Sequence, residues 1–211
     1  MKVGEKPENS GFREDMGRIF YLMGKSSSGK DTIYKELLKK EELRLKKIVL
    51  YTTRPARAGE KDGVQYHFVD EETWRAFEDA GKVIEMREYH TFHGLWKYFT
   101  VDDGQIRLED HDYLIIGTIE SYVKTRAYFG EEKVIPIMIE LDDGVRLQRA
   151  LDRERSEGSP RYEEMCRRFL SDAADFSAEK KLAAGIGQEF YNEDLERCLN
   201  EIASYMLSLK K

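Results

Sequence analysis

The segment Gly24-Lys25-Ser26-Ser27-Ser28-Gly29-Lys30 constrains this chain more than any other stretch. It matches GxxxxGK, follows a short apolar run at residues 18–23 and precedes a helical pattern over residues 31–40. In such a context, small residues allow backbone N–H groups to wrap a phosphate, and the start of the helix adds partial positive charge. The sequence therefore predicts a buried strand, a phosphate-binding loop and a helix, in that order.

The rest of the chain alternates apolar runs with helical patterns. Further strands are predicted over residues 47–53, 113–117, 133–141 and 189–192. Helices are predicted over residues 119–129, 144–154, 161–170 and 194–209. This alternation indicates an α/β fold of the P-loop NTPase type, with a parallel sheet and flanking helices.

Residues 54–112 break this alternation. They contain a half-exposed strand pattern over 64–69, a helical pattern over 71–80 and an aromatic hairpin over 83–100 that is broken at Gly94. We expect a core of residues 17–53 and 113–211, an inserted β-rich lobe of residues 54–112 and a helical lid within 149–168. Residues 1–16 are polar and are expected to form a disordered leader.

The phosphate-binding loop supplies the predicted donor site. Lys30 is expected to reach the β- and γ-phosphates of a nucleotide as a mobile cation. The predicted cofactor-binding residues are Gly24, Ser26, Ser27, Ser28, Gly29, Lys30, Asp31 and Thr32. Loops of this type usually have Ser or Thr after the lysine to bind Mg²⁺, whereas this chain has Asp31 followed by Thr32. The Asp31 carboxylate can coordinate Mg²⁺, repel the phosphates or act only on the first helical turn, and the sequence leaves these open. We assign no metal ligand.

A second phosphate-binding motif follows in residues 51–68, YTTRPARAGEKDGVQYHF. Arg54 and Arg57 lie three apart after a strand, and a guanidinium is a permanently charged, bidentate donor suited to a monophosphate. Tyr66 on the neighbouring strand offers a hydroxyl to the same anion. The stretch resembles the guanylate kinase signature TTRPxRxGExxGxxYxF, and the resemblance extends at lower density over residues 18–209. It implies Mg²⁺- and ATP-dependent phosphorylation of a nucleoside monophosphate, with GMP the leading acceptor.

The resemblance also implies an acceptor pocket. Glu85 resembles the glutamate that accepts hydrogen bonds from guanine N1 and N2. Tyr98 resembles the tyrosine that contacts the acceptor phosphate, and Thr100 the residue that contacts the base. The family usually has a serine that contacts guanine O6 where this chain has Leu50. It usually has an aspartate in the base pocket where this chain has Thr118, so Thr118 is the predicted substrate-binding residue at that position. Another nucleotide, or a sugar acceptor such as ribose 1,5-bisphosphate, therefore stays open as the substrate.

Arginines in the C-terminal half resemble the mobile lid of nucleoside monophosphate kinases. Arg149 and Arg153 lie four apart, on one face of a predicted helix, and Arg168 lies on the next. With Lys30, these are the predicted catalytic residues, because such arginines stabilise charge on the transferring phosphoryl group. Asn192 resembles the asparagine that contacts the donor adenine. A noncatalytic interaction module of the same fold is the remaining alternative, and the presence of Lys30 and the lid arginines opposes it.

Composition limits the partners. Lysine and arginine total 35 against 41 aspartates and glutamates, a net charge of −6, which argues against binding long nucleic acid. The two cysteines have no metal-binding spacing and suit a reducing cytoplasm, where we expect the protein to act. No apolar run approaches the roughly 18 residues that a membrane helix needs, so no membrane partner is expected. The predicted partners are small nucleotides.

Overall fold

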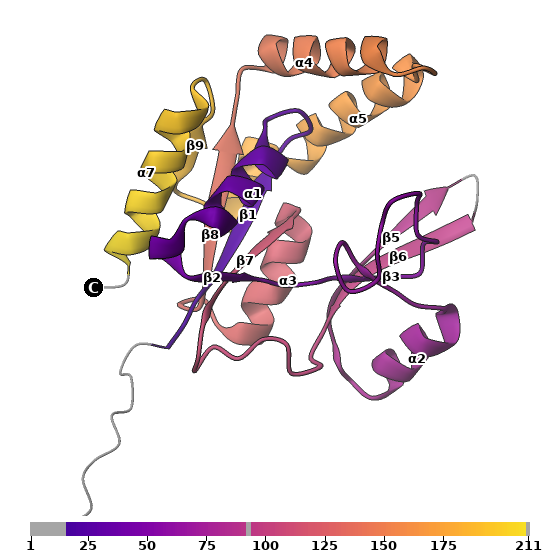
Figure 1. The fold of residues 1–211 in the computed structure, drawn as a ribbon, viewed down its shortest axis with the longest axis vertical. Helices are drawn as coiled ribbons and strands as arrows, with labels where there is room; N and C mark the ends of the chain where they lie inside the picture. Colours follow the sequence, from indigo (N-terminus) through magenta and orange to yellow (C-terminus); the bar gives the residue numbers. More distant parts are fainter. Residues whose placement is uncertain (1–15, 92–93, 210–211) are drawn as a thin grey trace, which may run out of the picture.

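The computed structural model describes residues 16–91 and 94–209, so the predicted leader lies almost wholly outside the described part. Its central layer is a five-stranded parallel sheet in the order β2-β7-β1-β8-β9 (Figure 1). The strands are β1 (Ile19–Gly24), β2 (Leu45–Lys47), β7 (Asp112–Gly117), β8 (Val134–Glu140) and β9 (Glu189–Tyr191). The predicted α/β fold with a parallel sheet is confirmed.

Helices cover both faces of this sheet. They are α1 (Lys30–Lys39), α3 (Ile119–Phe129), α4 (Asp143–Ser156), α5 (Tyr162–Asp175), α6 (Ala178–Ala183) and α7 (Leu195–Ser208), with a short 3-10 turn η1 (Glu41–Leu43). Helices α1 and α7 pack on one face and α3 on the other, while α4 and α5 form a hairpin beyond the end of the sheet (Figure 1).

Strand β1 explains why the sheet is covered on both sides. All six of its residues are buried. Ile19, Tyr21 and Met23 join the apolar cluster on the side of α3, whereas Phe20 and Leu22 join the cluster on the side of α1 and α7. A strand whose successive side chains enter two separate cores must lie in the middle of a three-layer arrangement. The phosphate-binding loop therefore begins at the most deeply anchored strand of the fold.

A second sheet forms the lobe, in the order β4-β3-β6-β5. Its strands are β3 (Tyr51–Thr52), β4 (His67–Phe68), β5 (Val83–Thr91) and β6 (Gly94–Val101). Helix α2 (Glu71–Asp79) covers one face, where Tyr51, Trp74, Phe99 and Val101 form a small apolar core. The opposite face turns toward the core of the protein, since β5 contacts α3 and the Lys124 ammonium on α3 donates to the Met86 carbonyl.

The prediction of one continuous strand over residues 47–53 is wrong. The segment is divided between the two sheets, with β2 ending at Lys47 and β3 beginning at Tyr51. Between them the chain crosses from core to lobe, and the Val49 N–H is satisfied by the Gln105 side chain at 2.8 Å instead of by a sheet partner. The apolar pattern arises because Ile48 and Leu50 are buried at this crossing. Strand β4 is also shorter than predicted, and η1 and α6 were not predicted.

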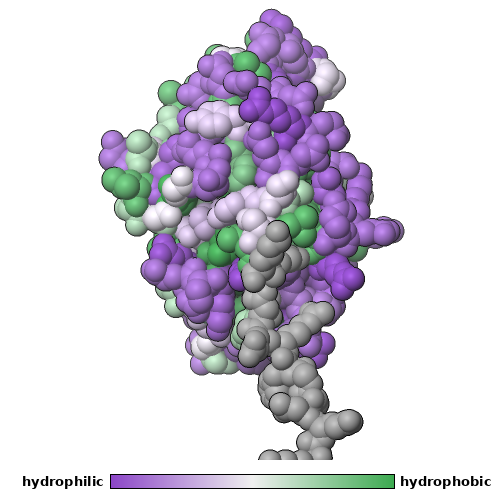
Figure 2. Space-filling view, turned by 90° about the vertical axis from the view of Figure 1, so that its left-hand side faces the viewer, coloured by the Kyte–Doolittle hydropathy of each residue, from purple (hydrophilic) through white to green (hydrophobic). Residues whose placement is uncertain are grey.

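The surface is consistent with a chain that is 36% charged. The face in Figure 2 is mainly hydrophilic, and its apolar residues occur in small, separate groups. None of the helices in the described ranges is both long and apolar enough to cross a membrane.

Candidate functional site

Because the core strands are parallel, the segments after β1, β7, β8 and β9 meet at one edge of the sheet. The phosphate-binding loop follows β1, and Thr118 follows β7. Asp142 and Asp143 follow β8, and Asn192 follows β9. The fold thus brings together segments that are more than 160 residues apart in the chain, and the site is built at this edge.

The phosphate-binding loop has the left-handed backbone that its small residues permit. Ser27 has φ 63° and Gly29 has φ 89°. A Cβ at Gly29 would lie 2.2 Å from Asn192 Nδ2. That same amide donates to the Ser28 carbonyl at 2.7 Å, and Asn192 is 3% exposed. Gly29 is therefore required both by its conformation and by the close approach of Asn192.

In this structure Asn192 stabilises the loop through its hydrogen bond to Ser28. Its contact with adenine stays a prediction. The remaining predicted donor residues follow the loop directly. Lys30 begins α1 and is half-buried, whereas Asp31 and Thr32 are exposed in the first helical turn. Ser28 is buried, and Gly24 ends β1.

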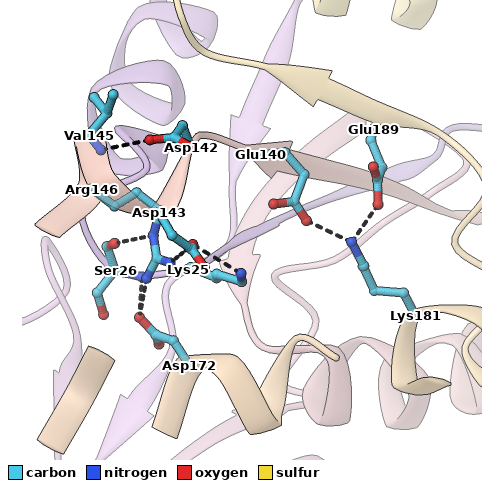
Figure 3. Close-up of polar contacts among 10 residues, drawn as sticks. All are labelled: Lys25, Ser26, Glu140, Asp142, Asp143, Val145, Arg146, Asp172, Lys181 and Glu189. Atoms are coloured by element: carbon cyan, nitrogen blue, oxygen red, sulfur yellow. Dashed lines mark hydrogen bonds and ion pairs between the residues drawn. The ribbon is translucent and has the colours of Figure 1, made fainter. Parts of the chain in front are cut away.

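An unpredicted cluster ties the loop to the α4–α5 hairpin (Figure 3). Arg146 on α4 is 1% exposed, and its Nε donates to the Ser26 carbonyl at 3.0 Å. Its two terminal nitrogens pair with Asp143 and with Asp172 on α5, the latter at 3.0 Å. The Asp172 carboxylate also accepts the Ser26 N–H at 2.7 Å. One buried guanidinium thus joins the loop and both helices.

The charges of this cluster compensate one another. Lys25 donates to Asp143 at 3.2 Å (Figure 3). Burial acts to raise the pKa of Asp143, but the hydrogen bonds from Arg146 and Lys25 hold that pKa below its ordinary value. Arg146 also lies 4.9 Å above the centre of the Phe169 ring. The nearby Lys181 ammonium forms ion pairs with Glu140 and Glu189, at 2.9 and 2.6 Å. It thus links the last residue of β8 to the first residue of β9.

The predicted lid arginines occupy different environments. Arg149 NH1 lies 3.7 Å from the position that a Gly29 Cβ would take, so it reaches the phosphate-binding loop. Arg153 and Arg168 are exposed, and Arg168 Nε lies 4.0 Å from Glu164. The inward face of α4 carries Arg146, Ala150 and Glu154 instead. The structure therefore brings one of the three predicted lid arginines to the loop.

The predicted acceptor residues lie on the lobe. Arg54 is 3% exposed and its terminal nitrogens bond both Glu60 oxygens, at 2.8 and 2.9 Å. The Arg54 guanidinium lies 5.4 Å from the centre of the Tyr66 ring, and the Tyr98 hydroxyl is close enough to contribute to its raised pKa after Glu60. Tyr66 and Tyr98 pack edge to face with ring centres 5.6 Å apart. Arg57 is exposed; its backbone N–H donates to the Glu60 carboxylate at 2.7 Å, and its carbonyl accepts the Glu60 N–H at 3.0 Å.

The predicted base-contacting residues divide into two groups. Thr100 donates to Glu85 at 2.8 Å, and both side chains are buried. Thr118, in contrast, is the N-cap of α3 and forms a capping box with Ser121. Leu50 is 8% exposed and packs in the same apolar cluster as Tyr21. Glu85 and Thr100 thus form a buried polar pair, whereas Thr118 and Leu50 have structural contacts of their own.

Within the described ranges, no group of three or more histidine, cysteine, aspartate or glutamate side chains is arranged to hold a metal. A magnesium ion that accompanies a nucleotide needs fewer protein ligands, because it usually keeps several waters and binds one or two carboxylates together with substrate phosphates. The exposed Asp31 carboxylate and Thr32 hydroxyl at the end of the loop fit such an ion chemically.

The parallel sheet, its phosphate-binding loop and the helical hairpin define a P-loop nucleotide phosphotransferase. The family model described as guanylate kinase matches residues 16–95. The guanylate kinase of Nitratidesulfovibrio vulgaris is 32% identical over 196 residues, which cover 92% of this chain and 88% of that relative. The chain therefore belongs to the guanylate kinase family and is a nucleoside monophosphate kinase.

Other comparisons agree. The guanylate kinase of Caldanaerobacter subterraneus is 27% identical over 195 residues, covering 92% of this chain and 88% of the relative. The crystal structure of guanylate kinase from Anaplasma phagocytophilum matches with a TM-score of 0.63 and 25% sequence identity. That match covers 93% of this chain and 87% of the other. The similarity thus spans core and lobe together.

Replacing Arg146 tests whether the cluster holds the loop. We expect Arg146→Met to lower the free energy of unfolding by roughly 3–5 kcal/mol, because Asp143 and Asp172 lose their buried partner. Adding Asp172→Asn should recover about 0.5–3 kcal/mol of that loss. Arg155→Met on the same helix, at an exposed position, is the matched control and should change stability by less than about 0.5 kcal/mol. Urea unfolding of the wild type and these three variants measures the differences. A loss of stability in Arg146→Met no greater than in the control would show that the cluster does not hold the loop.

The Arg54–Glu60 pair predicts a pH dependence. Hydrogen bonds from Arg54, then from the Arg57 backbone, lower the pKa of Glu60 from 4.5 to about 2. A lowered pKa in the folded state adds stability that is complete above pH 4.5 and is lost as the pH falls toward about 2. Glu60→Gln should therefore be less stable than the wild type at neutral pH, and the gap should narrow as the pH falls below 4.5. Urea unfolding across this range tests it, with exposed Glu109→Gln as the control; a gap independent of pH would refute it.

Proposed function

We propose that this protein transfers the γ-phosphoryl group of ATP to GMP, giving ADP and GDP. The observation that carries the proposal is the buried Glu85–Thr100 pair on the core-facing side of the lobe. Its carboxylate can accept two N–H groups from one base edge, while Arg54 lies on the same lobe to hold a phosphate. Strand β5, which carries Glu85, contacts α3, and the Lys124 ammonium on α3 donates to the Met86 carbonyl at 3.0 Å. The pair thus lies where the lobe meets the core, and the Glu85 charge, after burial, raises the pKa of Tyr21 on β1.

The donor half of the reaction rests on the loop and α1. Backbone N–H groups of residues 24–29 and the Lys30 ammonium are proposed to hold the ATP phosphates. The Ser26 N–H is bonded to Asp172 in this structure. A phosphate oxygen that takes this N–H must displace that carboxylate, so binding of ATP would break this one contact between α5 and the loop while Arg146 still joins them. Bound Mg²⁺ would neutralise charge on the phosphates, with Asp31 and Thr32 as its nearest candidate ligands.

The acceptor half rests on guanidinium and hydroxyl donors. Arg54, Arg57, Tyr66 and Tyr98 are proposed to hold the GMP phosphate in line with the donor. The Glu60 carboxylate fixes Arg54 with both oxygens, which leaves the Arg54 Nε buried and without a hydrogen bond among the described residues. Such orientation before binding lowers the entropic cost of placing two phosphates together.

Closure of the α4–α5 hairpin is proposed to complete the site. Arg149 already reaches the loop, whereas the exposed side chains of Arg153 and Arg168 would swing toward the transferring group, Arg168 by leaving Glu164. Their charges would stabilise the developing negative charge, and closure would exclude the water that otherwise hydrolyses ATP. We place this activity in the cytoplasm, on small nucleotides and not on long nucleic acid or membranes.

The acceptor is tested by a coupled ADP-release assay with Mg-ATP. The panel contains GMP, dGMP, IMP, AMP, UMP, CMP and ribose 1,5-bisphosphate. We expect turnover with GMP and dGMP and little with the others, because the Glu85 carboxylate selects a base edge with two adjacent N–H donors. Turnover confined to ribose 1,5-bisphosphate would support a kinase activity but would show that GMP is not the acceptor. ATP binding without turnover of any acceptor would favour a noncatalytic interaction module.

Lys30 tests the donor site separately. Lys30→Met should lower kcat by about 100- to 1,000-fold, since it removes a cation aimed at the transferring phosphoryl group. Binding of GMP, measured by titration calorimetry, should stay near the wild-type value because the acceptor pocket lies on the lobe. Lys35→Met, at an exposed position of the same helix, is the control and should keep full turnover. Unchanged turnover in Lys30→Met would exclude the proposed donor role.

A further inference from the structure

We infer that Arg87 is a specificity-determining residue that donates a hydrogen bond to the O6 atom of guanine, beside the Glu85 carboxylate. This inference rests on the proposed function, because it concerns the same acceptor pocket. It assigns the O6 contact to a side chain on β5, because this chain has the apolar Leu50 where the family usually has a serine.

The register of the lobe sheet places Arg87 on the pocket face. Residues two apart on a strand point to the same side, so Glu85 and Arg87 share a face of β5. Their partners on β6 are Thr100 and Tyr98, respectively, and directly opposed residues of an antiparallel pair also share a face. Met86 points the other way, into the apolar core under α2. Arg87 therefore lies among the proposed base- and phosphate-binding residues.

Glu85 and Arg87 form a close, buried pair with unused bonding capacity. Arg87 Nε lies 3.2 Å from one Glu85 oxygen, and the exposed fractions of the two side chains are 11% and 0%. Yet neither that oxygen, Glu85 Oε2, nor Arg87 Nε makes a hydrogen bond within the described residues. The other oxygen, Oε1, accepts from Thr100 at 2.8 Å and lies 3.5 Å from the Arg87 NH2 group. A buried acceptor and a buried donor thus stand side by side.

The surroundings keep the guanidinium charged. Burial alone would lower the pKa of Arg87, but the Glu85 charge, followed by the nearby Tyr21 hydroxyl, raises it above its ordinary value. Arg87 is paired with Tyr98 across the two strands, and the Tyr98 ring packs on the Tyr66 ring with centres 5.6 Å apart, so Arg87 also lies close to the two tyrosines proposed to bind the phosphate. An ion pair in such a place costs desolvation energy that further hydrogen bonds must offset. A ligand edge carrying both donors and an acceptor would supply those bonds.

Guanine has such an edge. Its N2 and N1 positions are adjacent donors, and O6 beside them is an acceptor. The Glu85 carboxylate can accept from N2 and N1, and the Arg87 guanidinium beside it can donate to O6. The order of acceptors and donor on the protein is therefore complementary to that on guanine. Adenine presents an acceptor at N1 and a donor at position 6. Its N1 would therefore face the Glu85 acceptor, and its amino group would face the Arg87 donor, so neither pair could form a hydrogen bond. Buried polar groups left unpaired by the wrong base give strong discrimination.

The decisive comparison uses GMP and 6-thio-GMP as acceptors. The thio analogue keeps both N–H donors for Glu85 but replaces O6 by sulfur, a weaker acceptor. We expect the wild type to prefer GMP and Arg87→Met to lose about 5- to 150-fold in kcat/KM for GMP. The ratio of GMP to 6-thio-GMP should then fall toward one. The preference for GMP over IMP, which lacks the N2 amino group, should persist because Glu85 is intact.

Two further variants separate a contact with the base from a structural role. Arg87→Lys keeps the charge and one donor and should restore part of the preference for GMP over 6-thio-GMP. Arg75→Met, an exposed arginine of the same lobe, should leave both activities unchanged. If Arg87→Met loses activity but keeps the wild-type ratio of GMP to 6-thio-GMP, Arg87 only positions Glu85 and the inference is wrong. A fully active Arg87→Met would also refute it. A wild type inert toward GMP would instead overturn the proposed function, a result visible before any variant is made.

Discussion

The buried guanidinium of Arg146 is the interaction on which the geometry of the donor site depends. The phosphate-binding loop leaves the central strand β1 with a left-handed backbone at two positions, and the hydrogen bond within the loop from the Ser28 N–H to the Lys25 carbonyl, at 3.2 Å, does not join the loop to the rest of the fold. Arg146 fixes the loop by binding the Ser26 carbonyl while pairing with a carboxylate from each helix of the α4–α5 hairpin. Asn192 supports the other side of the loop at Ser28. The position of the hairpin and the shape of the loop are therefore coupled.

The same arrangement recurs around the acceptor. Three buried or nearly buried arginines, Arg54, Arg87 and Arg146, are each held by a carboxylate from a nearby turn, strand or helix. Each pair keeps a cation in place inside a protein whose net charge is −6. Arginines held in this way are oriented before an anion or a base arrives, so less conformational freedom is lost on binding. Under the proposed function, such arginines would allow a chain with acidic composition to bind two highly charged nucleotides.

Sequence patterns predicted the features that depend on local order. The buried strand, the loop and α1 follow from a continuous motif, and the hairpin follows from an aromatic-rich stretch that is broken at Gly94. Residues 47–53 were misassigned because an apolar run does not reveal which of two sheets it joins.

The contacts of Arg146 with Ser26 and Asp172 join residues 120 and 26 positions apart, and no spacing rule indicates them. Arg87 is different, because its two-residue spacing from Glu85 on a predicted strand would have placed it on the pocket face. From the sequence alone, Thr118 fits both a pocket residue and the N-cap of a helix. The structure shows that it is the N-cap of α3.

We propose that a donor site on the core and an acceptor site on the lobe bind their two nucleotides at the same time, so that a phosphoryl group passes directly from one to the other. This proposal is tested most directly by titration calorimetry with adenosine and guanosine joined 5′ to 5′ through five phosphates. We expect this ligand to bind at least about 100-fold more tightly than ATP or GMP alone, because one molecule occupies both sites. We also expect the adenosine–uridine counterpart to bind more weakly. Affinity no greater than that of ATP, or equal affinity for the two linked ligands, would contradict the proposal.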